Sequence, residues 1–360
     1  MSNIYNRDSV SHITLNPFAY ITRSVGTSGI ALLALLLLQV VMLFVTASYS
    51  SILLVFVACL ASVASELLYY FTKKRFASNF VYAVIHGLIA GLLVSSEYPP
   101  LAVFLVCFVC FTLCKYAWDG FGHSWINPVA LTLVVLYFFN MNFFTPFLIS
   151  AEDLQTKNAA LVLIQNGTVP LAKFDAAVTA FLNRTVFHFF GVVIPEGYVS
   201  LFWDSGSSIA AFRFNFLTLI SSIILISLEM VDALIPAVFI LIYSLLVRFL
   251  LPVFLGTEIY GDILLALLTS GTLFSSLFLL QWHGTIPLTK CGKIIFAVIS
   301  AVAAFFILGF GTSSIGFVFV VLGMNFVSPL IEYFENLSLN KKLNKILTPK
   351  VNEMLEDENV

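Results

Sequence analysis

Two segments of the sequence combine asparagine with proline inside apolar surroundings, a pattern that can leave backbone and amide groups available to a ligand. They are Asp119-Gly-Phe-Gly-His-Ser-Trp-Ile-Asn-Pro128 and Asn325-Phe-Val-Ser-Pro329. Proline removes a backbone donor, and a membrane interior has no water to satisfy the freed carbonyl, so such breaks persist where they line a cavity or a ligand. Each segment is predicted to be an interrupted helix at a binding cavity, with a kink that binds nothing as the alternative.

Ionisable side chains inside or beside apolar runs are further candidates, because a charge at a helix centre costs roughly 2.5–3.5 kcal/mol and commonly marks an ion path. The carboxylates are Glu66, Glu229, Asp232, Glu258 and Asp262. Each lies near the end of its run, and Glu66 is close to Lys73, so interfacial carboxylates are favoured over an ion path. His86 is interpreted as a hydrogen-bonded neutral imidazole between helices rather than a proton relay. Arg248 is expected to extend to the interface.

Three cysteines, Cys107, Cys110 and Cys114, are spaced to share one helical face. Thiolates at that spacing could hold a metal, but no fourth ligand is evident and buried cysteine commonly acts as a small apolar residue, so packing is favoured. His123 and His188 lack metal-ligand spacing. We predict no metal site and no catalytic residue on this chain, since nucleotide-binding loops and Ser-His-Asp patterns are not visible.

The elements that must position these residues are long apolar helices. Of the 360 residues, 60% are hydrophobic and 10% charged, against roughly 25% charged in soluble domains. Runs near the roughly 20 residues that cross about 30 Å of hydrocarbon predict an all-α polytopic integral membrane protein with ten transmembrane helices. The expected helices are residues 30–49, 52–71, 81–95, 101–117, 129–149, 212–228, 233–251, 262–280, 293–309 and 315–331. A net charge of −2 without a basic block argues against nucleic-acid partners.

The ten runs divide into two halves of five around a polar loop. The predicted organisation is an N-terminal segment 1–29, a first half 30–149, an extracytoplasmic loop 150–211, a second half 212–331 and a tail 332–360. With both termini in the cytoplasm, most Lys and Arg residues fall in inner loops, as the positive-inside bias requires. An odd number of crossings per half predicts an inverted repeat, whose functional site lies where interrupted helices of the two halves meet.

The first asparagine–proline segment carries a resemblance to a known family. Lys115-Tyr-Ala-Trp-Asp-Gly-Phe-Gly-His-Ser-Trp-Ile-Asn-Pro128 resembles the K-x-x-x-G-G-x-G-x-N-x-F-N-P-A signature of the NqrB/RnfD family, whose members are membrane subunits of the sodium-pumping NADH:quinone reductase and of the Rnf complex. Further landmarks, in family order, are Asn16-Pro17, Pro99-Pro100, Thr269-Ser-Gly-Thr272 and Gly323-Met-Asn-Phe-Val-Ser-Pro-Leu-Ile-Glu332. The resemblance covers nearly the whole chain, and the chain length suits RnfD better than the longer NqrB.

The resemblance implies a multi-pass subunit of the inner (cytoplasmic) membrane, partnered with other Rnf- or Nqr-type subunits, in a complex that moves Na+ or H+. It also implies a flavin, FMN or riboflavin. The positions that match family motifs, and so are candidates for lining a flavin site or cavity, are Gly120, Gly122, Asn127, Pro128, Gly271, Thr272 and Asn325.

The chain departs from the family at the covalent flavin segment. Family members attach FMN through its phosphate to a Thr in a D-x-x-S-G-A-T segment, and the closest match is Asp175-Ala-Ala-Val-Thr-Ala-Phe181. Phe181 stands at the acceptor position and has no hydroxyl, so covalent FMN is expected to be absent. Trp282 likewise replaces an acid in Leu280-Gln-Trp-His-Gly-Thr-Ile-Pro287. These changes indicate a divergent member that relies on flavins of partner subunits or binds one noncovalently.

Three functions remain open from the sequence. The favoured one is a membrane subunit of an Rnf-type complex that couples electron transfer between ferredoxin and NAD, or a related pair, to Na+ or H+ movement, either without catalysis of its own or as a flavin carrier. The alternative is a stand-alone transporter or channel for a small solute or ion, which the inverted halves and the missing acceptor Thr favour. The third is a subunit kept only for assembly.

Overall fold

A computed structural model describes residues 25–73, 80–118, 124–144, 158–255, 261–282, 284–310 and 315–357. These residues form helices and connecting segments, with one isolated antiparallel bridge between Ser95 and Ile209. Several positions named above lie outside the described residues, among them Asn16, Pro17, Gly120, Gly122, His123 and Glu258.

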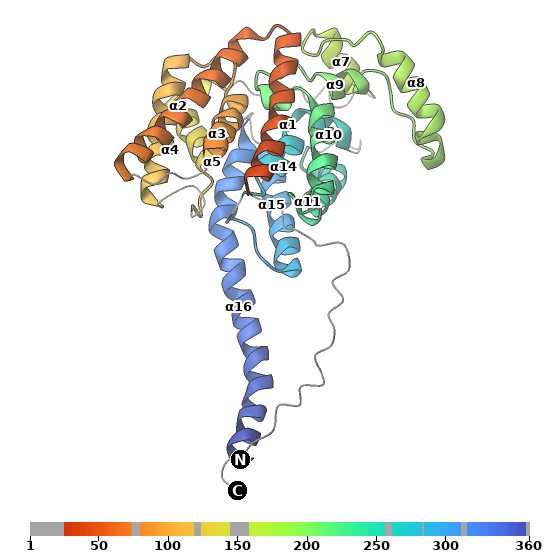
Figure 1. The fold of residues 1–360 in the computed structure, drawn as a ribbon. Helices are drawn as coiled ribbons and strands as arrows, with labels where there is room; N and C mark the ends of the chain where they lie inside the picture. Colours follow the sequence, from red (N-terminus) through yellow and green to blue (C-terminus); the bar gives the residue numbers. More distant parts are fainter. Residues whose placement is uncertain are drawn as a thin grey trace, which may run out of the picture.

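The described helices fall into two groups of long apolar segments separated by short helices (Figure 1). The first group is α1 (Val25–Val45), α2 (Tyr49–Lys73), α3 (Phe80–Leu93), α4 (Pro100–Ala117) and α5 (Pro128–Phe139). The short helices between the groups are α7 (Ala159–Gln165), α8 (Asp175–Thr185) and α9 (Tyr198–Trp203). The second group is α10 (Asn215–Ser227), α11 (Leu234–Leu245), α12 (Leu251–Leu255), α13 (Ile263–Thr269), α14 (Thr272–Phe278), α15 (Lys290–Phe310) and α16 (Gly316–Asp357).

Membrane-spanning length is reached by six helical segments of the described chain. They are Gly26–Val45, Tyr49–Lys73, Pro100–Ala117, Leu234–Phe254, Lys290–Leu308 and Gly316–Leu343, and α3, α5 and α10 are shorter apolar helices. The eighth expected helix, residues 262–280, is wrong as a single helix, because the chain breaks at Ser270 and Gly271 into α13 and α14. A polytopic membrane protein is therefore supported, while the count of ten crossings stays a prediction.

Corresponding helices make corresponding contacts in the two halves. In the first half α2 packs on α3 and α4, α4 packs on α5, and α3 packs on α1 and α5. In the second half α11 packs on α14 and α15, α15 packs on α16, and α14 packs on α10 and α16. The halves meet where α5 contacts α16 and α1 contacts α10. This repeated pattern is the one a duplicated five-helix unit would give, and the inverted orientation of the two units stays a prediction.

Close packing of α3 on α2 depends on two glycines one helical turn apart. A Cβ on Gly87 would lie 2.5 Å from the Cα of Cys59, and one on Gly91 would lie 2.5 Å from the Cα of Val55. Small residues at this spacing let two helix backbones approach, which is a common way to join helices in a membrane where no hydrophobic force drives them together. The Ser62 hydroxyl donates to the Ala83 carbonyl at 2.7 Å and adds a polar link between the same helices.

The last helix is longer than expected and is not interrupted. The predicted break at Asn325–Pro329 is wrong, because α16 runs continuously from Gly316 to Asp357. Proline at position 329 removes only the hydrogen bond to the carbonyl four residues earlier, and the remaining helical bonds carry the chain through. The expected separate tail is instead an extension of α16 beyond the bundle (Figure 1). Glu335 on this extension accepts a hydrogen bond from Thr289, whose hydroxyl also caps Gly292 N–H at the start of α15 (3.0 Å).

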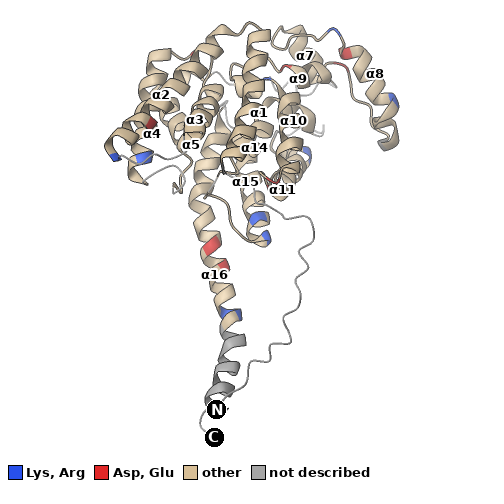
Figure 2. Cartoon of the chain, viewed as in Figure 1, with Lys and Arg blue, Asp and Glu red and all other residues tan. Residues whose placement is uncertain are grey.

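Basic residues gather at the end of the bundle from which the α16 extension leaves (Figure 2). Lys73 and Lys115 lie in the last turns of α2 and α4, and Lys290 begins α15. Few charges appear elsewhere along the spans. This end is the one that the positive-inside bias assigns to the cytoplasm, an assignment that stays a prediction.

Candidate functional site

The structure brings the two asparagine–proline segments together. With the Asn325 amide in the orientation that satisfies both of its contacts, its side-chain oxygen, on α16, accepts from the backbone N–H of Asn127, just before α5, at 2.9 Å. The Asn325 amide nitrogen then donates to the Val321 carbonyl at 3.3 Å. Trp125 and Phe326 make an edge-to-face contact beside them, with ring centroids 5.3 Å apart. The prediction that these segments meet across the two halves is confirmed.

Asn127 also joins α5 to the end of α14. Its side-chain oxygen accepts from the N–H groups of Val129 and Ala130 at 3.0 and 3.2 Å, which caps the start of α5 after Pro128 takes the first helical position. Its amide nitrogen donates to the Leu279 carbonyl at 3.2 Å. Both side-chain atoms of Asn127 are therefore bonded within the protein. This arrangement fits a junction between the halves, and flavin binding by Asn127, Pro128 and Asn325 stays a prediction.

Gly271 and Thr272 lie at the other end of α14, where the eighth apolar run is broken. Gly271 has a φ of 69°, a left-handed conformation that suits glycine, and a Cβ there would overlap the ring of Phe212. The Asn215 amide, at the start of α10, donates to the Leu268 carbonyl at 2.9 Å and so satisfies one carbonyl in the last turn of α13. Thr272 is buried. A helix is therefore interrupted here, where the sequence led us to expect one continuous helix, and α14 connects the break to the Asn127 junction.

Residues 279–282, after α14, connect the halves and were not selected from the sequence as a site. Leu279 accepts from Asn127, and the Trp282 ring lies edge-to-face on the imidazole of His86, with centroids 4.7 Å apart. His86 on α3 is buried and contacts the Tyr82 carbonyl through Nδ1, which supports the interpretation of a hydrogen-bonded imidazole between helices. The signal in the sequence that could have identified this segment is the polar residue Gln281, where the apolar run ends.

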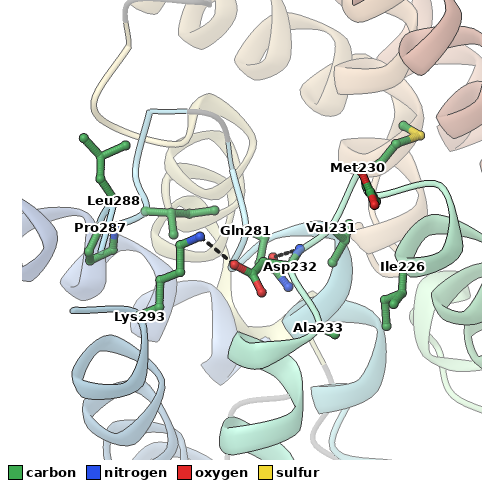
Figure 3. Close-up of a pocket in the computed structure, with 11 residues that line it drawn as sticks. Ile226, Met230, Val231, Asp232, Ala233, Gln281, Pro287, Leu288 and Lys293 are labelled. Atoms are coloured by element: carbon green, nitrogen blue, oxygen red, sulfur yellow. Dashed lines mark hydrogen bonds and ion pairs between the residues drawn. The ribbon is translucent and has the colours of Figure 1, made fainter. Parts of the chain in front are cut away.

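A cavity of about 560 Å³ opens beside this segment, between the α10–α11 turn and the start of α15 (Figure 3). Lys293 donates to Asp232 at 2.5 Å, and Asp232 N–H donates to the Gln281 side-chain oxygen at 3.0 Å. The hydrogen bond from Lys293 lowers the pKa of the Asp232 carboxyl. Glu229 is exposed at the same turn, which has a φ of 52° at that residue. Both carboxylates are therefore in reach of water, as the interfacial interpretation predicted.

Glu66 differs from that interpretation. Its carboxylate pairs with Lys115 on α4, and the two side chains are 3% and 0% exposed. The Lys115 ammonium also lies 4.8 Å from the centre of the Tyr69 ring, a cation–π distance. The interpretation of Glu66 as an interfacial carboxylate, within reach of Lys73 or the interface, was wrong, because helix packing places α4 against Glu66. The signature lysine thus forms a buried ion pair between two spans.

The remaining candidates lie where packing or capping explains them. Cys107, Cys110 and Cys114 are buried along α4, as the packing interpretation expects, and no group of three His, Cys, Asp or Glu side chains within the described ranges could share a metal. Asp262 caps α13 by accepting from Leu265 N–H at 3.0 Å. Arg248 donates to the Gly261 carbonyl at 3.4 Å.

Comparison with known families gives one match. Residues 12–339 match the model of the NQR2, RnfD, RnfE family, which is most of the chain and includes every described element named above except the far end of α16. The chain belongs to the NQR2, RnfD, RnfE family. A search of curated proteins finds no match. Membership supports a membrane subunit of an Rnf- or Nqr-type complex, and the matched region includes both Asn127 and Asn325.

The segment Asp175–Phe181, which resembles the flavin-attachment motif, lies in α8. Asp175, at its first position, is buried and accepts from Ser200 N–H and Oγ at 2.6 and 2.5 Å and from Gly197 N–H at 3.0 Å. Burial alone would raise the pKa of this carboxyl, but the hydrogen bonds from Ser200, Gly197 and Thr179 outweigh it and lower the pKa. Asp175 therefore fixes α8 to the start of α9.

The hydroxyl groups near the acceptor position do not fit a phosphoester to FMN. Phe181 is 62% exposed and carries no hydroxyl. Thr179 is buried and donates to Asp175 at 3.3 Å, and Thr185 donates to the Phe181 carbonyl at 2.7 Å. Neither hydroxyl group therefore stands at the acceptor position of the motif that this segment resembles, and the absence of covalent FMN stays a prediction.

Proposed function

We propose that this chain is the membrane subunit of an Rnf-type complex that couples electron transfer between ferredoxin and NAD, or a related donor and acceptor, to movement of Na+ or H+. The observation that carries the proposal is the family match over residues 12–339, together with the meeting of its two signature segments at Asn127 and Asn325. In two-halved membrane proteins the contact between the halves is where an ion path and its control are built.

The buried polar groups at this contact, and the buried ion pair within the first half, have distinct roles in the proposal. The Asn127–Asn325 bond and the Asn127–Leu279 bond hold α5, α14 and α16 together. Glu66 and Lys115 place a compensated pair of charges within the spans, where an ion or proton that approaches Glu66 would compete with Lys115 for the carboxylate. No step is assigned to a covalent flavin, because Phe181 cannot hold one. Electrons are supplied by flavin or iron–sulfur groups of partner subunits.

The decisive experiment is purification of the tagged full chain in mild detergent, with identification of the proteins that co-elute. We expect Rnf-type subunits in the eluate, with flavin and iron–sulfur absorbance from the partners. Inverted membrane vesicles from cells lacking the chain should lose ferredoxin-dependent NAD reduction coupled to a Na+ or H+ gradient, and the chain supplied in trans should restore it. Normal coupled activity in its absence would overturn the proposal.

Flavin content of the chain itself is tested separately. After denaturing electrophoresis we expect no flavin fluorescence in the band of this chain, because the acceptor position is Phe181. A fluorescent band would show a covalent flavin attached elsewhere and would overturn the assignment of electron transfer to partner subunits alone.

A stand-alone transporter for a small solute or ion is the second candidate. The observation that favours it is the break between α13 and α14 at Gly271, since broken helices at the interface of two halves commonly bind transported solutes. Recovery of the chain alone, active in solute uptake after reconstitution into vesicles, would favour this candidate over the redox complex.

A further inference from the structure

Residues 171–193, which we call the outer arm, expose large apolar side chains beyond the helix bundle. Phe181 is 62% exposed, Phe189 is 85% exposed and Val193 is 77% exposed. Other exposed apolar residues of the arm are Leu171, Phe174, Val186 and Val192. A concentration of this size on a segment outside the spans marks an interaction surface rather than scattered surface residues.

The outer arm is a fixed structure. α8 is followed by a 3-10 turn, Phe187–Phe190, and the chain then returns along α8. Asn183 closes this return by two hydrogen bonds of 2.8 Å, one from its amide nitrogen to the Ile194 carbonyl and one from Ile194 N–H to its oxygen. Asp175 fixes the base of the arm to α9. The exposed apolar side chains therefore lie on a hairpin that these hydrogen bonds hold closed.

The arm lies beside the spans. In Figure 1, α8 stands away from the bundle and runs at the height of α1 and α10, at the end opposite the α16 extension. An aromatic row links the arm to α10, with Phe174 and Trp203 ring centroids 5.2 Å apart and Trp203 stacked on Phe216 at 4.3 Å. Trp203 thus lies beside the start of the apolar helix α10, and Trp in such a place is typical of the membrane interface. Below Phe216, α10 exposes further apolar side chains, Leu219, Ile220 and Ile223.

The exposed charged side chains of the outer arm are basic. Lys173 and Arg184 are exposed, whereas Asp175, the one acid within residues 171–193, is buried. Basic side chains next to an apolar surface suit the anionic headgroups of phospholipids, because their long stems can lie along the apolar region while the charge reaches the phosphates.

We propose that the outer arm is a membrane anchor whose occupant is anionic phospholipid of the leaflet opposite the α16 extension. Phe181, Phe189 and Val193 insert at the boundary between headgroups and acyl chains, and Lys173 and Arg184 contact lipid phosphates. Insertion of this kind reaches about 5–10 Å into the leaflet. The anchor holds the polar segment between the halves against the membrane surface, independently of any electron-transfer function.

The test is fluorescence quenching by labelled lipids, with the full chain alone in nanodiscs of phosphatidylcholine and phosphatidylglycerol. Cys291, the exposed native cysteine, is first replaced by Ser. Bimane is then attached at Phe189→Cys or, as a matched control in the exposed turn after α7, at Asn166→Cys. Lipids carrying a doxyl group near the headgroup should quench bimane at position 189 about threefold more than at position 166. Phe189 is exposed, so its replacement leaves the core intact.

Equal quenching at positions 189 and 166, with aqueous iodide reaching both, would overturn the anchor. The same result is expected if a partner protein covers the outer arm, because no partner is present in the nanodisc. The occupant of the arm would then be a protein and not lipid. A second variant, Phe181→Cys, must show quenching of the same order as Phe189→Cys if the whole arm is inserted.

Discussion

In the first half of the bundle, α2 and α4 are joined by Glu66 and Lys115, which are sealed from solvent, whereas the matching helices of the second half, α11 and α15, begin beside Asp232 and Lys293, which face an open cavity. The backbone differs in the same way. α3 is one continuous helix, but its counterpart is divided at Gly271, and α11 continues through a π-helical turn at Leu246–Leu250. Irregular helices of this kind are common at functional sites. Among the described residues, the first half therefore combines a regular α3 with a buried ion pair, and the second half combines irregular helices with an ion pair in reach of water.

The largest test of this difference is Lys115→Ala. It leaves Glu66 charged and buried without its partner, and we expect a loss of about 3–5 kcal/mol in stability. Lys293→Ala, the counterpart in the second half, should lose about 0–1 kcal/mol because its pair is in reach of water. Thermal unfolding in detergent measures both. The double variant Glu66→Gln/Lys115→Met should recover most of the loss, and equal losses for the two single variants would remove the distinction between the halves.

Gly271→Ala tests the divided helix. A side chain at a left-handed φ costs about 1–2 kcal/mol, and overlap with Phe212 adds about 1–3 kcal/mol. Gly284→Ala is the matched control, because Gly284 also has a positive φ (81°) but its nearest neighbour to a new Cβ is the Ser124 carbonyl at 3.6 Å. We expect a lower unfolding temperature for Gly271→Ala than for Gly284→Ala. The same decrease in both would mean that packing on Phe212 does not hold the break.

Asn127→Ala tests the contact between the two halves at Asn127. It removes the α5 cap and the bond to Leu279, and we expect a loss of about 2 kcal/mol. Asn158→Ala removes the same two kinds of bond at the exposed start of α7, where Asn158 accepts from Leu161 N–H at 3.1 Å and donates to the Glu196 carbonyl at 2.8 Å. Water can replace those bonds, so this control should lose about 0.5–1 kcal/mol. A larger loss for Asn158→Ala would argue against a junction at Asn127.

The smallest effect is expected from pH at the cavity. Lys293 lowers the pKa of Asp232 from its ordinary value of 3.8, so the pair stabilises the protein at neutral pH and loses that effect as the pH falls below this value. Lys293→Met should raise the pKa of Asp232 and reduce stability at neutral pH by less than about 1 kcal/mol, an effect that salt weakens. Unfolding curves at several pH and salt values provide the measurement. A change that salt leaves unaltered would contradict a solvated pair.

The position of most spans could be predicted because apolar runs end at clear signals, such as Pro99-Pro100 before α4 and Asn127-Pro128 before α5. The eighth run misled the prediction because hydropathy stays high through Ser270 and Gly271. The conformation of Gly271 depends on Phe212, which lies far away in the sequence. At Pro329 the prediction placed a break where the helix continues. A single proline in a long helix removes one hydrogen bond and need not end the helix.

The candidate site could be predicted only where an asparagine stands close to a proline inside an apolar run. Asn127 and Asn325 were found because each stands near a proline in an apolar run. The partner of Glu66 could not be predicted, because choosing Lys115 over Lys73, which is on the same helix as Glu66, requires knowing how α2 and α4 pack. Trp282 and Leu279 contribute a ring face and a backbone carbonyl, which no spacing of polar residues reveals.

The unbroken length of α16 has a mechanical consequence. A helix of 42 residues is roughly 63 Å long, and one end of it holds Asn325 at the junction while the other lies well outside the bundle. Between these two ends, the helix is joined to the start of α15 by the Glu335–Thr289 hydrogen bond. A force applied to the distal end, far from the bilayer, would reach the contact between the halves as a small tilt.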